Sequence, residues 1–271
     1  MRRGVYILPS LFTVGTLVCG YYAILAALRG SLAMAAGGVD GASAAAFDNA
    51  AKAIGWAILF DGLDGRIARL TNSSSAFGRE FDSLADVITF GVAPAMLAYS
   101  WGIRAVSELF GPPWIQHIHQ LGWIVTFAYV ICGAARLGRF NIESAKPTAD
   151  RRYFVGMPIP AAAGTVAAIV HWEKAPLVAS GYSLCWMGVV GILAFLMVSR
   201  MRYYSFKTLD LRRRRSYMAI IFLGLIIWAI FVYSEPVLLT IALTYALSGI
   251  VLRITSKFRP HPPAPEEVHV A

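Results

Sequence analysis

The stretch DGLDGRIARLTNSSSAFGREFDSLAD, residues 61–86, decides the fold because it sets four aspartates in or beside long apolar runs. They form two close pairs, Asp61 with Asp64 and Asp82 with Asp86. A spacing of three or four residues puts both members of a pair on one face of a helix. The connection between the pairs is short and polar. We therefore expect two adjacent helices that bring four carboxylates together, and carboxylates at membrane depth indicate a functional site.

Four carboxylates at one site need cations to offset their charge. Oxygen ligands suit hard divalent ions, so Mg²⁺ or Mn²⁺ is expected, and Ca²⁺ would suit a roomier site. The stretch contains no His or Cys, which argues against zinc. Arg66, Arg69 and Arg79 lie close by, and metal ions beside arginines suit phosphate or diphosphate chemistry. The alternative is a set of buried structural aspartates paired with these arginines.

The whole chain has the composition of a polytopic membrane protein. Of its 271 residues 58% are hydrophobic and 14% are charged, and the mean hydropathy is +0.61. We predict an all-α integral membrane protein in which residues 30–49 form a loop and the Pro-rich tail from Ser256 is disordered. Eight spans are expected, at about residues 5–28, 50–70, 82–102, 119–140, 157–173, 179–198, 217–233 and 237–254.

The basic residues indicate how these spans are oriented. With the N-terminus inside, twenty of the 24 Lys and Arg fall in inner segments and four fall in outer segments. This asymmetry predicts that both termini and the aspartates face the cytoplasm, with the protein in the inner membrane. The net charge of +9 is then explained by the membrane surface, and no nucleic-acid partner is expected.

Three further stretches lie on the same predicted side, at residues 135–141, 154–163 and 199–207. Their basic side chains are suited to a pocket wall that binds phosphate or carboxylate groups, but positive-inside anchoring would also explain them. The candidate residues are Arg136, Arg139, Arg200, Arg202 and Lys207.

The aspartate stretch resembles the motif of the CDP-alcohol phosphotransferases, Asp-x2-Asp-Gly-x2-Ala-Arg-x8-Gly-x3-Asp-x3-Asp. The chain supplies every fixed position at the same spacing, with Asp61, Asp64, Gly65, Ala68, Arg69, Gly78, Asp82 and Asp86. The resemblance implies a six-helix membrane core, here residues 1–207, and a homodimer. Residues 208–255 would then hold a basic loop and two extra spans, and residues 256–271 a cytoplasmic tail.

The three basic stretches resemble those of the bacterial and archaeal CDP-diacylglycerol–serine O-phosphatidyltransferases. Met157 departs mildly from the usual leucine, and Ser10 and Gly15 stand where asparagine is expected. The resemblance implies transfer of a phosphatidyl group from CDP-diacylglycerol to the hydroxyl of L-serine, with release of phosphatidylserine and CMP.

The same resemblance implies a role for each motif residue. Asp61, Asp64, Asp82 and Asp86 would bind metal ions, and Asp86 would also act as general base toward the serine hydroxyl. Gly65, Ala68, Arg69 and Gly78 would contact the CDP-lipid. The five basic candidates would hold the serine carboxylate or the donor phosphate.

Two kinds of alternative remain open at this point. The same chemistry would serve glycerol 3-phosphate, an inositol phosphate or choline as acceptor, or an ether lipid as donor. A divalent cation transporter, from a different class, would also place aspartates in a membrane. The arginines on the same face weigh against the transporter, because they would repel cations.

Overall fold

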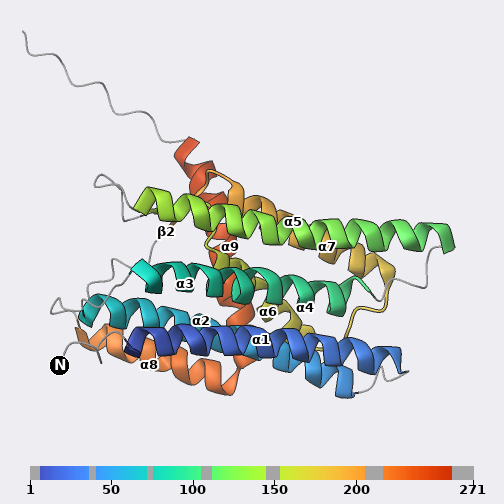
Figure 1. Ribbon diagram of the computed structural model, residues 1–271, viewed down its shortest axis with the longest axis horizontal. Helices are drawn as coiled ribbons and strands as arrows, with labels where there is room; N and C mark the ends of the chain where they lie inside the picture. The colour runs from blue at the N-terminus through green and yellow to red at the C-terminus, as the bar shows by residue number, and fades with distance from the viewer. Residues whose placement is uncertain are drawn as a thin grey trace, which may run out of the picture.

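The computed structural model describes residues 7–36, 41–71, 76–104, 112–144, 153–204 and 216–257. These residues are almost entirely helical, which confirms the predicted fold class (Figure 1). The exception is a pair of three-residue strands, which the sequence did not lead us to expect.

The first four long rods lie side by side (Figure 1). Helix α1 spans Ile7–Ala35 and packs along α2, Gly41–Thr71. The third rod is continuous through α3, Ala76–Asp86, the π-helical segment η2, Val87–Val92, and α4, Ala93–Gly102. Helix α5, Pro112–Ser144, begins with two prolines, which the first turn of a helix tolerates.

The remaining helices complete the bundle. Helix α6 spans Ile159–Glu173, and α7 spans Ser180–Val198 and packs against α5. Helix α8, Ser216–Val232, is followed at once by α9, Ser234–Lys257, which packs against α6. Strand β1, Tyr153–Val155, pairs in antiparallel fashion with β2, Arg202–Tyr204, so the chain entering α6 is tied to the chain leaving α7.

The predicted spans correspond closely to these helices, with one clear error. The expected loop over residues 30–49 is wrong, because α1 continues to Ala35 and α2 already begins at Gly41. Alanine is the best helix former, so a small-residue run favours helix once neighbouring helices cover it. Gly30 lets α1 approach Phe47 of α2 closely, since a Cβ there would lie 2.8 Å from the Phe47 ring. Helix α9 also runs two residues into the predicted tail, whose residues 258–271 lie outside the described part.

Five helical stretches in the described residues are long and apolar enough to cross a membrane. They are Leu11–Ala35, Phe77–Gly102, Gln116–Glu143, Gly181–Val198 and Ser234–Thr255. The predicted spans in α2, α6 and α8 are not among them. Helices α6 and α8 have only 15 and 17 residues, and α2 carries Asp48, Lys52 and the first aspartate pair. The chain is therefore an integral membrane protein.

Candidate active site

Three of the four motif aspartates meet at one end of the bundle. Asp61 comes from α2, whereas Asp82 and Asp86 come from α3. One carboxylate oxygen of each lies within 4.8 Å of the others, and all three side chains are half-buried. The two helices thus bring the two pairs together, as the motif spacing predicts.

The fourth aspartate, Asp64, is not a member of this group of three and is buried, with 6% of its surface exposed. The Thr13 hydroxyl of α1 donates a hydrogen bond to its Oδ2. This bond orients the Asp64 carboxylate. Sequence reasoning missed Thr13, because its only signal is one hydroxyl in an apolar run.

Three features of the third rod help to fix the positions of Asp82 and Asp86. The π-helical segment starts directly after Asp86, and such segments are frequent at functional sites. Inside it, Thr89 donates a hydrogen bond to the Thr16 carbonyl of α1 at 3.2 Å. On the other side, Asn141 of α5 donates to the Ser83 hydroxyl at 2.9 Å. The aspartate-bearing turns of α3 are therefore held by both α1 and α5.

The surface beside the aspartates on α2 is open. Gly65 is exposed, and no described atom lies within 4 Å of the place where its Cβ would stand. Gly78 lies half-buried in the first turn of α3. Ala68 and Arg69 belong to the last turn of α2, but their side chains lie outside the described part.

Arg136, near the end of α5, is a basic candidate that is buried close to the aspartate cluster. Only 6% of its surface is exposed, and its guanidinium carbon stands 5.2 Å from the centre of the Phe140 ring. It lies near enough to Asp86 and Glu143 for their negative charges to act on its guanidinium. Arg136 therefore brings a positive charge to the buried edge of the aspartate cluster.

Arg139, one turn further along α5, links three segments of the bundle through hydrogen bonds. It donates hydrogen bonds to the Val155 carbonyl at 2.7 Å and the Val198 carbonyl at 3.3 Å. These bonds fasten α5 to β1 and to the end of α7. Its predicted role in binding substrate stays a prediction.

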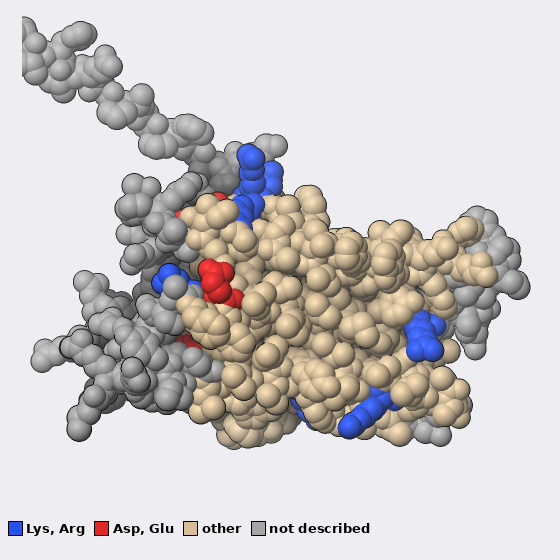
Figure 2. Space-filling view, viewed as in Figure 1, with Lys and Arg blue, Asp and Glu red and all other residues tan. Residues whose placement is uncertain are grey.

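The last three basic candidates follow α7. Arg200 is exposed just beyond the end of this helix. Arg202 belongs to β2, but its side chain lies outside the described part, as does the whole of Lys207. Figure 2 shows acidic and basic side chains close together near the start of α3, and other basic side chains toward the opposite end.

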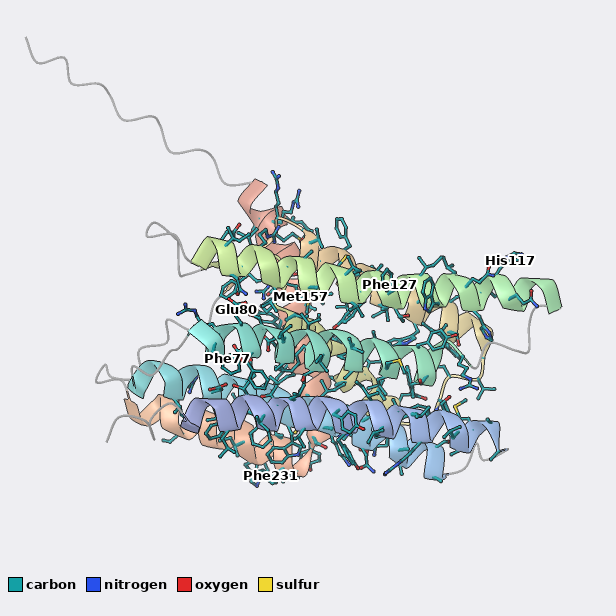
Figure 3. All side chains as sticks on the ribbon, in the orientation of Figure 1. Phe77, Glu80, His117, Phe127, Met157 and Phe231 are labelled. Atoms are coloured by element: carbon teal, nitrogen blue, oxygen red, sulfur yellow. The ribbon has the colours of Figure 1, made fainter. Side chains whose placement is uncertain are left out.

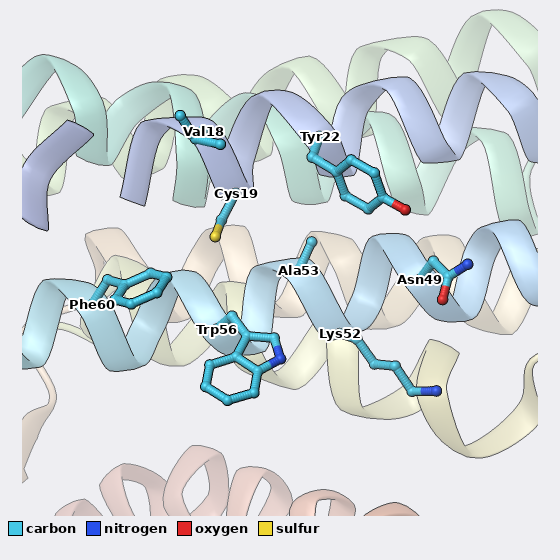
Figure 4. A pocket seen from close by; sticks show the side chains of 8 residues that line it. All are labelled: Val18, Cys19, Tyr22, Asn49, Lys52, Ala53, Trp56 and Phe60. Carbon is cyan, nitrogen blue, oxygen red and sulfur yellow. The ribbon is translucent and has the colours of Figure 1, made fainter. Parts of the chain in front are cut away.

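A groove of about 470 Å³ lies between α1 and α2 (Figure 4). Its only charged group is Lys52, whose amine pairs with Asp48 at 2.7 Å. The lining residues are Val18, Cys19, Tyr22, Asn49, Lys52, Ala53, Trp56 and Phe60. The groove lacks acidic groups and arginines, so we place the candidate active site at the aspartates.

The aspartate cluster fits a hard divalent cation. Three carboxylates within reach of one ion, from two different helices, give an oxygen-only ligand set of the kind that Mg²⁺, Mn²⁺ and Ca²⁺ prefer. Glu80, on the same helix as Asp82, is exposed and stands outside the cluster (Figure 3). Of the carboxylates of α3, the cluster therefore includes Asp82 and Asp86 but not Glu80.

Comparison with known proteins points in the same direction. The family model described as CDP-alcohol phosphatidyltransferase matches residues 6–194. A CDP-diacylglycerol–serine O-phosphatidyltransferase of Helicobacter pylori strain J99 is 36% identical over 222 residues, which cover 82% of this chain and 81% of that protein. The protein of that name from Bacillus subtilis is 36% identical over 201 residues, 74% of this chain and 91% of the relative. A Saccharomyces cerevisiae protein of the same name is 38% identical over 124 residues, 44% of this chain and 40% of its own.

Proposed function

The chain belongs to the CDP-alcohol phosphatidyltransferase family, and from this premise we propose that it transfers the phosphatidyl group of CDP-diacylglycerol to L-serine. The products are phosphatidylserine and CMP. The observation that carries the proposal is the group of three aspartates from two helices, with Arg136 beside it. The printed names of the relatives support serine as the acceptor.

In the proposed reaction, the serine hydroxyl oxygen forms a bond to the phosphorus that carries diacylglycerol. The bond from that phosphorus to the oxygen of CMP breaks, and CMP leaves with the electron pair. The hydroxyl proton passes to the carboxylate of Asp86. A serine hydroxyl is a poor nucleophile at neutral pH, so a carboxylate within hydrogen-bond reach would increase its reactivity.

The other aspartates prepare the donor site. Asp61, Asp82 and Asp86 would hold the divalent ions, and Asp64, oriented by Thr13, is proposed as a further ligand. When bound, Mg²⁺ or Mn²⁺ would neutralise charge on the diphosphate and on the departing CMP.

The surface next to these aspartates would accommodate the donor. The open face at Gly65 leaves room for the cytidine and diphosphate to lie against α2. Ala68, Arg69 and Gly78 belong to the same proposed surface by their place in the motif. Arg136 would bind an anionic group, either the serine carboxylate or the donor phosphate.

We place this site on the cytoplasmic side of the inner membrane, with both termini on that side. Arg79, Arg136, Arg139 and Arg200 lie at the aspartate end of the helices, which supports this orientation. CDP-lipids and free serine would be reached from there. A homodimer is proposed on the family resemblance.

The general base can be tested with Asp86→Asn in membranes supplied with CDP-diacylglycerol, labelled serine and Mg²⁺ or Mn²⁺. We expect CMP release to fall by about a hundredfold or more, since a positioned base contributes that much. Glu80→Gln is the matched control, because it also removes a carboxylate from α3 but lies outside the cluster. If Asp86→Asn released CMP as fast as Glu80→Gln does, Asp86 would be ruled out as the general base.

The acceptor can be identified in one competition assay. Unlabelled serine, glycerol 3-phosphate, inositol phosphate and choline are each added to the labelled-serine reaction. We expect only serine to dilute the labelled product. If another acceptor supported CMP release while no labelled serine product formed, serine would not be the acceptor. The reaction class would still stand.

A further inference from the structure

The groove between α1 and α2 is lined by side chains that the proposed transfer reaction does not use. Its apolar part includes Val18 of α1 and Trp56 and Phe60 of α2, and the Trp56 and Phe60 rings lie 6.4 Å apart between centroids. Val18 and Trp56 are 59% and 57% exposed, so the groove is open along its side. Because α1 is long and apolar enough to cross a membrane, this opening would face lipid acyl chains.

The two polar lining residues lie together at one end of the groove. Figure 4 shows Asn49 and Lys52 at that end and Phe60 at the other, with Trp56 between them. Asn49 and Lys52 are both exposed. An ammonium group has three N–H donors, so Lys52 can bind an oxygen of a second group while it pairs with Asp48 at 2.7 Å. The groove therefore has an apolar body and a cationic end, which is the polarity that suits a phospholipid.

The contacts of Asp48 indicate how deep Lys52 lies in the membrane. The Asp48 carboxylate also bonds to His171, in the last turn of α6. Lys174, directly after α6, pairs with Glu235 in the first turn of α9, and these side chains are 41% and 38% exposed. Helices that end beside a partly exposed ion pair mark a membrane–water boundary, because hydrocarbon cannot hydrogen-bond the freed backbone groups. Lys52, one helical turn from Asp48, therefore lies just inside this boundary.

The groove has the length of one membrane leaflet. Asn49 and Phe60 are 11 positions apart on α2, which corresponds to about 16 Å along the helix axis. The hydrocarbon of one leaflet is about 15 Å thick, half of the bilayer core. An acyl chain whose headgroup phosphate lies at Lys52 would thus pass Trp56 and end near Phe60.

The acyl chains of the CDP-lipid donor are the alternative occupant. A donor held at the aspartates would enter the groove at Phe60, which directly precedes Asp61. The methyl end of its chain would then lie against Lys52 and Asn49, and covering a cation with hydrocarbon costs free energy. The polar end of the groove therefore favours a lipid of the other leaflet.

We propose that this groove binds one phospholipid of the leaflet opposite the candidate active site, with its phosphate on Lys52 and Asn49 and one acyl chain along Trp56. The volume of about 470 Å³ lies within the range of ligand-binding pockets. The bound lipid fills the space between α1 and α2. This inference goes beyond the proposed function and does not depend on it.

The test is lipid binding to the delipidated, detergent-purified full-length protein, measured by native mass spectrometry while dioleoyl phosphatidylglycerol is titrated. Lys52→Gln should weaken the tightest binding about fivefold, the contribution expected of one lysine near a membrane surface. Arg29→Gln is the matched control, because Arg29 is exposed on α1 and is not part of the groove lining. Dioleoylglycerol has the same chains without the phosphate, so its affinity should be about fivefold lower in the wild type and unchanged by Lys52→Gln.

A second variant tests the apolar part of the groove without changing a charge. Val18→Trp fills the groove from its exposed side and should weaken the binding of both lipids, whereas Val251→Trp, at a valine 55% exposed on α9, should not. Equal phosphatidylglycerol affinity in the wild type, Lys52→Gln and Val18→Trp would overturn the proposal. It would also be overturned if CDP-diacylglycerol displaced the bound phosphatidylglycerol from the wild type but not from Asp61→Asn, because the groove would then belong to the donor.

Discussion

Gly156→Ala provides a sharp test of the way β1 and β2 brace the site. Gly156 has φ of +82°, a conformation that L side chains rarely adopt. A Cβ there would lie 2.3 Å from the Met197 carbonyl oxygen, 2.8 Å from Nη2 of Arg139 and 3.1 Å from the Ser199 carbonyl oxygen. Two of these neighbours are backbone atoms, so the clash cannot be relieved by rotating a side chain.

The magnitude follows from two additive costs. The left-handed conformation costs about 1–3 kcal/mol for a non-glycine residue, and forcing a methyl group into a packed position costs about 1–3 kcal/mol more. The free energy of unfolding should therefore fall by about 2–6 kcal/mol. At about 2–4 °C for each kcal/mol, that change lowers Tm by roughly 4–24 °C. Because Arg139 is one of the displaced groups, CMP release should fall as well.

The assay is thermal unfolding of the purified protein in detergent, followed by CMP release at a temperature where the variant is folded. Gly188→Ala is the matched control, because Gly188 lies within α7 and no described atom stands within 4 Å of its would-be Cβ. Alanine there should raise helix stability slightly, by up to about 1 kcal/mol. A Gly156→Ala protein with wild-type Tm and activity would refute the reasoning.

Further predictions concern the groups that hold the aspartates. Thr13→Val removes the hydrogen bond to Asp64 and should weaken the apparent affinity for the activating metal about tenfold. Thr13→Ser keeps the hydroxyl and should retain the wild-type affinity. An unchanged metal titration in Thr13→Val would contradict this role of Thr13. Ser83→Ala and Asn141→Ala should each lower the free energy of unfolding by about 1 kcal/mol, and the double variant should cost less than their sum. Strict additivity would show that the 2.9 Å contact is absent in solution. Chelation should abolish CMP release, and Mg²⁺ or Mn²⁺ should restore it; full activity without metal would end the metal proposal.

The parts of this structure that sequence could predict are those with a local signature. The aspartate spacing predicts that Asp61 and the second pair come together, because helix periodicity and a short connection determine it. The Ala-rich start of α2 was misjudged as a loop, since small residues also occur in loops and only packing against α1 decides between the two.

The parts that sequence could not predict depend on contacts between distant segments. Thr13 and Asp64 are 51 residues apart, and the signal at Thr13 is a single hydroxyl. The hydrogen bonds from the Arg139 guanidinium to backbone carbonyls of two other segments had no signal in the sequence, whereas its role in binding substrate stays a prediction. The hydrogen bond from the Tyr203 hydroxyl to the Ala246 carbonyl joins β2 to α9 across 43 residues of sequence. Charge and motif identify candidate residues in the sequence, whereas only the fold shows which groups these residues contact.

The most direct measurement is Mn²⁺ binding to the purified protein, followed by electron paramagnetic resonance. Two variants each remove one carboxylate of the cluster from a different helix, Asp61→Asn on α2 and Asp82→Asn on α3. We predict that both weaken Mn²⁺ binding at least about tenfold, while Glu80→Gln binds as the wild type does. Equal Mn²⁺ affinity in all four proteins would contradict the claim that two helices share a metal ion at this site.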